Sequence, residues 1–584
     1  MLCGLAAIVS FVLSSAVYGY QWRPTKPWGK PGNPTPKLGA VSSGDAQCSQ
    51  IGMQMLIKGG TAVDAAVATE FCLGVKRKSL LTTLYMNTNY LVVPDLVGIG
   101  GGGFALVRNK DGEYSFVDFR ESAPAASTED MFQGRDNDSL VGGLAVAVPG
   151  EVRGLHYLHQ RYGKLPWASL INPSVQTARN GFELGEYLNG VLRRISSPAF
   201  LTTPPWSQDF APGGALVKLG DAVKRKRLAK TLKRIASKGP DGFYRGPVAH
   251  SMIKEIQKKG GLMTVADLER YNVSVRDPVE IMYRGYRVVG TSAPSGSPVV
   301  LSALKILEGY QNMGLASAVN QSTHYLDEAL RFGYGQRTEL GDPDFVPYID
   351  DYQEKMLSAT LANEIRSIIS DNSTLPVENY NPKNFEVLST PGTSHLVSAD
   401  RWGLVVSLTS TVNTAFGARV MVPESGIILN NEMNDFSIPG STNFFGFEPS
   451  PNNFIRAGKR PQSSMSPVIV EKPGTNQIAL AIGGQGGSRI ISAVTQVLSY
   501  VLDRKKNCSA ALIEPRFHDQ LQPNQILFET TYNNATVESM AAKGHNTTWT
   551  PRRQAAVHVL RRLEDGSFEA AADPDQKGSG GIVT

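Results

Sequence analysis

One end of a predicted β-hairpin gathers the side chains that could do nucleophilic chemistry. Residues 395–411 contain two strand-like runs, HLVSA and GLVVSLTST, joined by the turn residues DRWG. Gly392 and Thr393 open the first strand, and Thr411 and Asn413 lie at the end of the second. Pairing of the two runs would bring these groups together. A threonine hydroxyl there could attack an acyl carbon, although most strand threonines only satisfy local hydrogen bonds.

A second polar segment follows the hairpin. The apolar run Ile427–Leu429 predicts a short buried strand, and the next residues, NNEMNDF, carry the carboxylates of Glu432 and Asp435 together with three amides. Burying such groups without partners would cost several kcal/mol. The segment therefore predicts a polar recognition surface for a small ligand.

These motifs resemble the γ-glutamyltranspeptidase family. The similar segments, in the order of the family, are GTSHL, TSTVNTAFG, ESGIILNNEMNDFS, RPQSSMSP and GGQGGSR, preceded by GGTAVDAAVA, IGGGGFAL, FRESAP, AVAVPGEVRGL and GYGQRTELGDP. The resemblance covers nearly the whole chain after its first residues. It implies an α+β fold, a four-layer αββα sandwich of the N-terminal-nucleophile hydrolase type. It also implies a proenzyme that cuts itself between Gly392 and Thr393.

The chemistry of such a cut explains why a threonine is needed. Its hydroxyl attacks the carbonyl of Gly392 and forms an ester, whose hydrolysis frees Thr393 as a new N-terminus. The released α-amine has a reference pKa near 8 and can act as the base that a bare alcohol lacks. A glycine at the preceding position permits a strained backbone.

The resemblance also assigns roles to the site residues. Thr393 is the nucleophile, Thr411 supports it, and Gly486 and Gly487 form the oxyanion hole. That last role agrees with the residues themselves, because GGQGGS lies between an apolar strand and an apolar-periodic helix, where backbone amides suit an anion. A nucleotide site is the rival interpretation, but the Walker lysine is absent.

The family's substrate-binding residues also have counterparts here. Asn413, Glu432 and Asp435 would hold the substrate α-ammonium, and Arg120, Ser463 and Ser464 would clamp its α-carboxylate, a task that suits the planar guanidinium of an arginine. Asn434 stands where the family has the first aspartate of a pair.

The implied activity is two-step acyl transfer. The γ-glutamyl group of glutathione or a related compound passes to Thr393, and then to water or to an amino acid or dipeptide. Residues 40–392 would form a large subunit and residues 393–584 a small one, as a heterodimer that shares one αββα domain. We expect no metal and no organic cofactor, because no His/Cys cluster has metal-ligand spacing in the sequence.

Two other functions stay open. One is a related acylase, such as a cephalosporin acylase, with the same nucleophile and a different acyl pocket. The other is an unprocessed, catalytically silent protein that binds γ-glutamyl ligands or serves structurally. Its support is the segment 76–97, which interrupts the family pattern as either a surface loop or a retained intron. Loop residues 440–459 resemble eukaryotic members, and Phe445 stands where bacterial relatives have a lid tyrosine.

Composition describes an ordinary globular protein. The chain has 584 residues, of which 41% are hydrophobic and 19% charged, so it can bury a substantial core. The net charge of +6 comes from scattered basic residues, which argues against a nucleic-acid partner.

The N-terminal residues indicate the secretory pathway. Residues 1–20 contain an apolar run typical of a signal peptide, or of a signal anchor if it is not cleaved, and only then would the protein associate with a membrane. Residues 21–39 form a Pro/Gly-rich linker. We expect a secreted, extracellular or vacuolar protein. Glycosylation sequons begin at Asn137, Asn272, Asn320, Asn372, Asn534 and Asn546, with an atypical one at Asn507.

Four cysteines fit that compartment. The spacing of Cys48 and Cys72 resembles a disulfide of eukaryotic family members, and two buried thiols are the alternative. Cys3 lies in the leader, and Cys508 has no partner.

The remaining patterns predict the elements around the site. Apolar spacing predicts helices over four ranges: 45–59, 62–74, 149–162 and 320–341. A strand over 116–119 would run into Arg120.

Overall fold

The structure is a computed structural model of the chain. It describes residues 37–76, 97–194, 198–388, 392–441, 446–552, 555–576 and 578–583. The predicted leader, most of the linker, segment 77–96 and Phe445 lie outside these residues.

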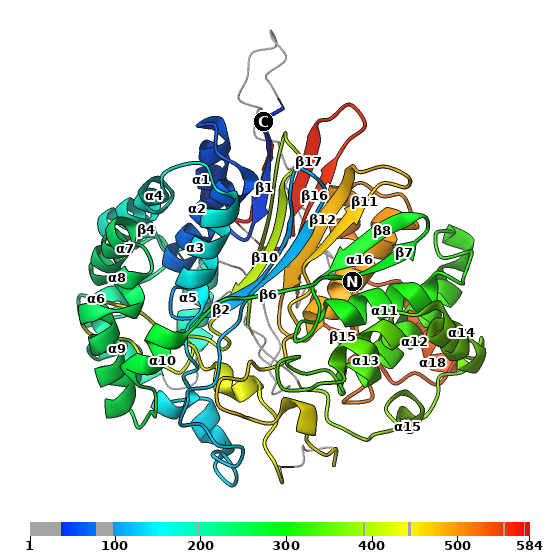
Figure 1. Ribbon diagram of the computed structural model, residues 1–584. Helices are drawn as coiled ribbons and strands as arrows, with labels where there is room; N and C mark the ends of the chain where they lie inside the picture. Colours follow the sequence, from blue (N-terminus) through cyan, green and yellow to red (C-terminus); the bar gives the residue numbers. More distant parts are fainter. Residues whose placement is uncertain are drawn as a thin grey trace, which may run out of the picture. The chain divides into compact units, whose positions relative to one another are not determined.

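Two antiparallel sheets lie face to face in the middle of the fold (Figure 1). The seven-stranded sheet has the order β18-β1-β9-β10-β2-β3-β6, and the six-stranded sheet has the order β17-β16-β12-β11-β8-β7. The strands of the first sheet are β18 (Gly580–Val583), β1 (Gly39–Ser43), β9 (Ser394–Asp400), β10 (Val405–Thr411), β2 (Gly102–Arg108), β3 (Tyr114–Phe119) and β6 (Ser274–Arg276). Those of the second are β17 (Phe568–Ala572), β16 (Ala556–Arg562), β12 (Ile478–Gln485), β11 (Val468–Glu471), β8 (Tyr286–Gly290) and β7 (Val279–Tyr283).

Helices cover the outer face of each sheet, so the architecture is the expected αββα sandwich (Figure 1). The layer on the seven-stranded sheet contains α1 (Ala46–Ile57), α2 (Ala62–Lys76), α3 (Glu151–Tyr162), α4 (Trp167–Asn180), α5 (Glu186–Arg194), α6 (Ser207–Phe210), α7 (Lys226–Lys238), α8 (Asp241–Tyr244), α9 (Gly246–Lys258) and α10 (Val265–Arg270). The opposite layer contains α11 (Ser297–Leu307), α12 (Val319–Arg337), α13 (Ile349–Met356), α14 (Ala359–Ile368), α15 (Val377–Tyr380), α16 (Arg489–Leu502), α17 (Cys508–Ile513) and α18 (Asn534–Ala542). Two small sheets, β4-β5 (Phe182–Glu183, Ala222–Val223) and β13-β14-β15 (Phe517–His518, Ile526–Glu529, Thr547–Thr550), lie among the helices.

The central strands are buried on both faces, which explains their composition. Every residue of β9, β10 and β12 is buried. Small apolar side chains such as Val397, Val405 and Ala481 fill the space between the sheets. The hydroxyls that interrupt these runs find partners: Ser407 of β10 donates to the carbonyl of Ile482 in the other sheet, at 2.9 Å. A serine or threonine can therefore occupy a buried strand without leaving its hydroxyl unpaired.

Most of the predicted elements are confirmed. The hairpin is β9 and β10, the four predicted helices are α1, α2, α3 and α12, and the predicted strand before Arg120 is the end of β3. The predicted strand Ile427–Leu429 is wrong, because only Ile428 makes an isolated bridge, to Met421. β1 begins at Gly39, the last residue of the predicted linker.

Both sheets contain strands from before and from after residue 392. In the seven-stranded sheet β1 lies between β18 and β9, and β10 pairs with β2. In the six-stranded sheet β8 pairs with β11. The two segments 40–392 and 393–584 therefore contribute to one shared core.

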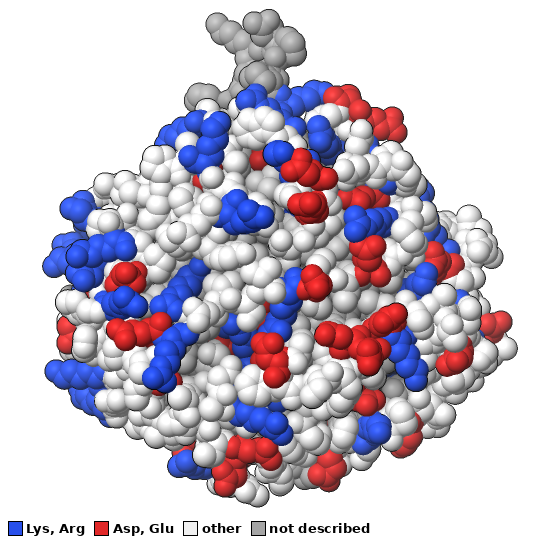
Figure 2. All heavy atoms as spheres, viewed as in Figure 1, with Lys and Arg blue, Asp and Glu red and all other residues white. Residues whose placement is uncertain are grey.

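The surface carries basic and acidic side chains interspersed over the face shown in Figure 2. Within the described residues, no helix combines the length and the apolar character that a bilayer crossing requires.

The predicted bond between Cys48 and Cys72 is present and joins α1 to α2, while Cys508 is a buried free thiol. Reduction should lower the free energy of unfolding by about 3 kcal/mol, because the bond closes a loop between residues 24 apart in sequence. Denaturant unfolding with and without a reductant measures this loss. A Cys72→Ala variant is the control, since it should be insensitive to the reductant; a reductant effect of equal size in that variant would contradict the assignment.

Candidate active site

Thr393 lies at the start of β9 and is buried between the two sheets. Gly392 before it has a φ of +69°, a left-handed conformation that favours glycine. The Thr411 hydroxyl, at the end of β10, donates to the Gly392 carbonyl at 2.7 Å. It also accepts from the backbone amide of Asn413 at 2.7 Å. Thr411 thus binds the carbonyl oxygen of the peptide bond that precedes Thr393.

The glycine-rich turn after β12 contacts the same threonine from the other sheet. The Gly486 amide donates to Thr393 Oγ1 at 3.1 Å. Gly486 and Gly487 have φ values of +127° and +64°, so both positions require glycine. The turn leads into α16, whose N-terminal backbone amides and helix dipole favour negative charge nearby.

Arg120 is buried among acidic side chains where β3 ends. Its guanidinium donates to Glu432 Oε1 and, at 2.5 Å, to Asp435 Oδ2. Burial alone would lower the pKa of Arg120, but the carboxylates of Glu432 and Asp435 raise it above its ordinary value. Burial raises the pKa of both carboxyl groups in turn, and Arg120 opposes that rise. The three side chains form a charged cluster in a dry environment.

Two acceptor oxygens in this cluster have no hydrogen-bond partner among the described residues. They are Glu432 Oε2 and Asn413 Oδ1. The Asn413 amide nitrogen donates to Asp435 Oδ1 at 3.0 Å, which turns its oxygen away from that carboxylate. Buried acceptors without donors are costly, so the cluster is suited to a ligand that brings N–H groups and positive charge.

The paired serines lie on the other side of Arg120. Ser464 Oγ accepts from Arg337 Nη2 at 3.1 Å, and Ser463 Oγ accepts from the Met465 amide at 3.2 Å. The backbone amide of Ser463 donates to the Pro294 carbonyl at 2.8 Å. Sequence reasoning missed Arg337, although its motif GYGQRTELGDP was noted. Its signal is an arginine at the end of an otherwise apolar helical face.

A small pocket joins these groups. It is lined by Arg120, Gly392, Thr393, Thr411, Glu432, Asp435, Ser463, Ser464, Met465, Gly487 and Ile490. The predicted residues Gly486 and Asn413 contact this set directly. Gly392 itself borders this pocket.

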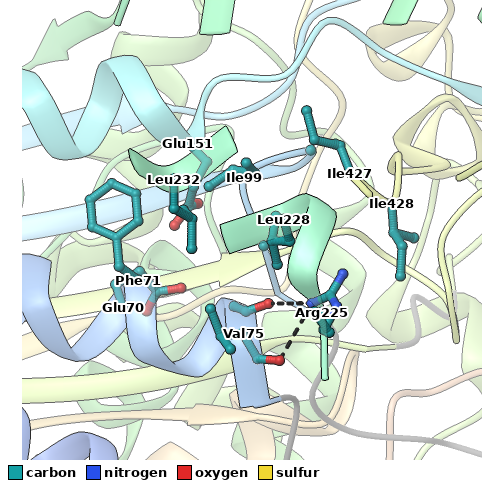
Figure 3. Close-up of a pocket in the computed structure, with 13 residues that line it drawn as sticks. Glu70, Phe71, Val75, Ile99, Glu151, Arg225, Leu228, Leu232, Ile427 and Ile428 are labelled. Carbon is teal, nitrogen blue, oxygen red and sulfur yellow. Dashed lines mark hydrogen bonds between the residues drawn. The ribbon is translucent and has the colours of Figure 1, made fainter. Parts of the chain in front are cut away.

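Three further buried acids extend the cluster away from the pocket, and the sequence did not predict them. Glu121 follows Arg120, with 3.8 Å between their charged groups, and burial raises its pKa to about 8. Glu70 of α2 accepts from the Ser410 hydroxyl at 2.5 Å, and burial raises its pKa to about 7. Figure 3 shows Glu70 and Glu151 in a cavity enclosed by α2, α3 and α7. In the sequence, Glu70 and Glu151 are each a glutamate within an otherwise apolar run, a pattern that could have indicated buried acids.

A metal-ligand group lies elsewhere. Among the described residues, His324, Glu328 and His545 could together hold an ion, and none of them lines the pocket beside Thr393. Spacing in the sequence does not reveal this group, because His545 is 221 residues from His324.

Known proteins are similar to this chain in sequence and in fold. A gamma-glutamyltranspeptidase family model matches residues 48–583. A glutathione hydrolase proenzyme of Arthroderma benhamiae is 47% identical over 557 residues, covering 94% of this chain and 93% of the relative. A glutathione hydrolase of Aspergillus flavus is 42% identical over 552 residues, covering 94% of this chain and 90% of the relative.

Two solved structures are similar in fold. The gamma-glutamyltranspeptidase of Helicobacter pylori has a TM-score of 0.53 at 32% identity, covering 59% of this chain and 96% of that one. A cephalosporin acylase of Bacillus halodurans has a TM-score of 0.78 at 24% identity, covering 95% of this chain and 99% of that one. The second likeness is one of fold alone.

Removing the cation of the charged cluster should destabilise the protein. Arg120→Met leaves Glu432 and Asp435 buried without a counterion, and we expect a loss of about 3–5 kcal/mol at neutral pH in denaturant unfolding. The pKa of each carboxyl in the folded variant rises further, so the folded state binds more protons than the unfolded one. The loss should therefore be smallest near pH 4 and grow as pH rises.

Arg401→Met is the matched control for this measurement. Arg401 is exposed in the hairpin turn, so its replacement should change the free energy of unfolding by about 0.5 kcal/mol or less. Equal losses in the two variants, or a loss at Arg120 that does not depend on pH, would contradict a charge-balancing role.

Proposed function

This chain belongs to the γ-glutamyltranspeptidase family, and we propose that it is a glutathione hydrolase proenzyme that cleaves itself between Gly392 and Thr393. The observation that carries the proposal is the arrangement around that peptide bond. The Thr411 hydroxyl contacts the Gly392 carbonyl, and the Gly486 amide holds the Thr393 hydroxyl oxygen.

Self-cleavage follows from these contacts. The Thr393 oxygen attacks the Gly392 carbonyl carbon, its proton passes to the departing Thr393 nitrogen, and the peptide bond becomes an ester. Negative charge develops on the Gly392 oxygen, which the Thr411 hydroxyl stabilises by hydrogen bonding. Water then hydrolyses the ester, leaving a carboxylate on Gly392 and a free α-amine on Thr393. Glycine at position 392 adopts the left-handed backbone without steric cost, which lets its carbonyl take this position beside Thr411.

Turnover uses the same residues in a second role. The Thr393 α-amine takes the proton from the hydroxyl, whose oxygen attacks the γ-carbonyl carbon of the substrate. The amides of Gly486 and Gly487 donate to the oxyanion, the substrate amine leaves with a proton, and a γ-glutamyl ester forms on Thr393. Water or the amino group of an amino acid or dipeptide then resolves the ester, which regenerates the hydroxyl.

The charged cluster supports recognition of a glutamyl group. A substrate α-ammonium supplies the donors that Glu432 Oε2 and Asn413 Oδ1 lack, beside Asp435. A substrate α-carboxylate accepts from Arg120, Ser463 and Ser464, with Arg337 behind Ser464. Because Arg120 is paired with Glu432 and Asp435 in the uncleaved chain, binding of the zwitterion exchanges one set of ion pairs for another.

This set of charges favours a γ-glutamyl substrate over the acyl groups of other acylases. The relatives at 47% and 42% identity are glutathione hydrolases, which supports glutathione as a substrate. The mature protein would be a heterodimer of residues 40–392 and 393–584, held together by the shared sheets.

We also propose passage through the secretory pathway. The Cys48–Cys72 disulfide and the exposed sequon asparagines Asn137, Asn272 and Asn372 fit an oxidising compartment. Whether residues 1–20 are cleaved or retained would decide between a free and a membrane-anchored protein.

Replacing the nucleophile separates the enzyme from the silent alternative. Thr393→Ala should remain one chain and show no release of a chromogenic amine from a γ-glutamyl anilide, whereas Thr393→Ser should still be cut. Intact mass and N-terminal sequencing give the result, with the wild-type small chain beginning at Thr393. Turnover by the alanine variant, or an intact wild-type chain, would overturn the proposal.

Thr411→Val should slow self-cleavage by roughly 10²–10³-fold, the usual cost of one lost oxyanion donor. The measurement is the rate at which the purified or in vitro translated precursor converts to two chains. Thr409→Val is the matched control, because Thr409 is equally buried on the same strand but its hydroxyl contacts His395 at 2.8 Å. Equal rates for the two variants would show that the Gly392 contact is not used.

A further inference from the structure

We infer that His324, Glu328 and His545 form a binding site for a divalent transition-metal ion, with Zn²⁺ as the ion that suits these donors. His324 and Glu328 lie one turn apart on α12, and His545 follows α18. One donor atom from each side chain lies within 4.8 Å of the other two. All three side chains are buried.

An oxygen acceptor lies on the outer side of each ring. His324 Nε2 lies 2.7 Å from the Ser370 carbonyl, which can only accept, so Nε2 carries a hydrogen and Nδ1 a lone pair. His545 Nδ1 lies 3.1 Å from the Asp327 carboxylate, near enough to act as the outer partner of that ring when Nε2 binds a metal ion. A carbonyl or carboxylate behind a histidine is the usual outer partner of a metal ligand.

The two inward nitrogens face each other. His324 Nδ1 and His545 Nε2 are 2.8 Å apart, and without an ion the N–H of His545 donates to the lone pair of His324. With the His545 hydrogen on Nδ1, toward Asp327, both inward nitrogens present lone pairs that one metal ion would bind.

Buried acceptor atoms around the rings also favour a cation. Glu328 Oε1 lies 3.8 Å from His545 Nε2 and has no hydrogen-bond partner among the described residues, and the same holds for both oxygens of Asp327. Arg331 pairs with Asp519 at 2.8 Å, and its single charge also acts on Asp327. A divalent ion would compensate the charges of Asp327 and Glu328 together.

The donor set selects the kind of ion. Two imidazoles and one carboxylate are a common zinc set, with bond lengths of about 2.0–2.2 Å and a fourth position for water. Tetrahedral ligands at that bond length lie about 3.3 Å apart, so the two rings must separate by about 0.5 Å, a small rotation.

The site would connect the two segments of the chain. His324 and Glu328 precede residue 392, and His545 follows it. Metal binding does not depend on the proposed cleavage, but once the chain is cut the ion would join one chain to the other through side-chain bonds.

The experiment begins with the full-length protein, purified through an affinity tag that contains no histidine. Plasma mass spectrometry should find one Zn²⁺ per chain. After removal by a chelator, titration with Zn²⁺ should restore one equivalent and raise the thermal unfolding midpoint. Titration with Co²⁺ should give the visible absorption of a tetrahedral site.

Four variants locate the ion. His545→Gln and Glu328→Gln should lose it, and the second keeps an acceptor for the Tyr380 hydroxyl, so the fold is preserved. Asp327→Asn should weaken Zn²⁺ binding by roughly 10–100-fold, as loss of an outer partner does. His518→Gln is the matched control, because His518 is a buried histidine bound by Ser492 and Gln520 and should leave the metal content unchanged.

Two outcomes would overturn the inference. One is a wild-type chain that neither carries nor takes up Zn²⁺ or Co²⁺; it would instead indicate that the hydrogen bond between His324 and His545 alone joins these side chains. The other is a metal content that survives His545→Gln but falls in His518→Gln. The cleavage-deficient Thr393→Ala should retain one Zn²⁺, so failure of the proposed enzyme activity and failure of the metal site are distinguishable.

Discussion

The active site depends on the antiparallel pairing of β9 with β10 in the middle of the seven-stranded sheet. The register places Ser394 opposite Ser410, and one residue further the Thr411 hydroxyl reaches the carbonyl of Gly392. A slip of one residue would turn every side chain of β9 to the opposite face. Packing of the two sheets fixes that register, and the facing sheet delivers the Gly486 amide to Thr393.

The second requirement is the balance of buried charge. Arg120 is fully buried, and its ion pairs with Glu432 and Asp435 leave acceptor oxygens at the edge of the cluster without donors. Well-packed apolar residues in these positions would make the folded protein at least as stable. The charged cluster is therefore better explained by ligand binding than by stability. Burial raises the pKa values of Glu70 and Glu121, which lie beyond Arg120, so these two carboxyl groups are partly protonated near pH 7.

Local patterns and the family motifs predicted much of this structure. Alternating and helical spacing located β9, β10, α2 and α16, since these elements are formed by contiguous residues. The motifs identified the residues that line the pocket, from Arg120 to Gly487. They could not predict Arg337, which approaches Ser464 from 127 residues away, or the meeting of His324 with His545. The predicted strand at Ile427–Leu429 failed for a related reason: its apolar pattern was right, but a strand needs a partner that the local sequence does not specify.

The position of β1 between two strands of the other segment, in the seven-stranded sheet, affects how the protein can refold before and after cleavage. While the chain is whole, β1 finds β9 and β18 as parts of one polymer, and folding is independent of concentration. Once the bond before Thr393 is cut, the same pairings join two separate molecules, and recovery from unfolding becomes a second-order reaction between them. The cut protein then stays folded because its unfolding barrier is high, which is kinetic stability. Folding as one molecule is possible only before the cut.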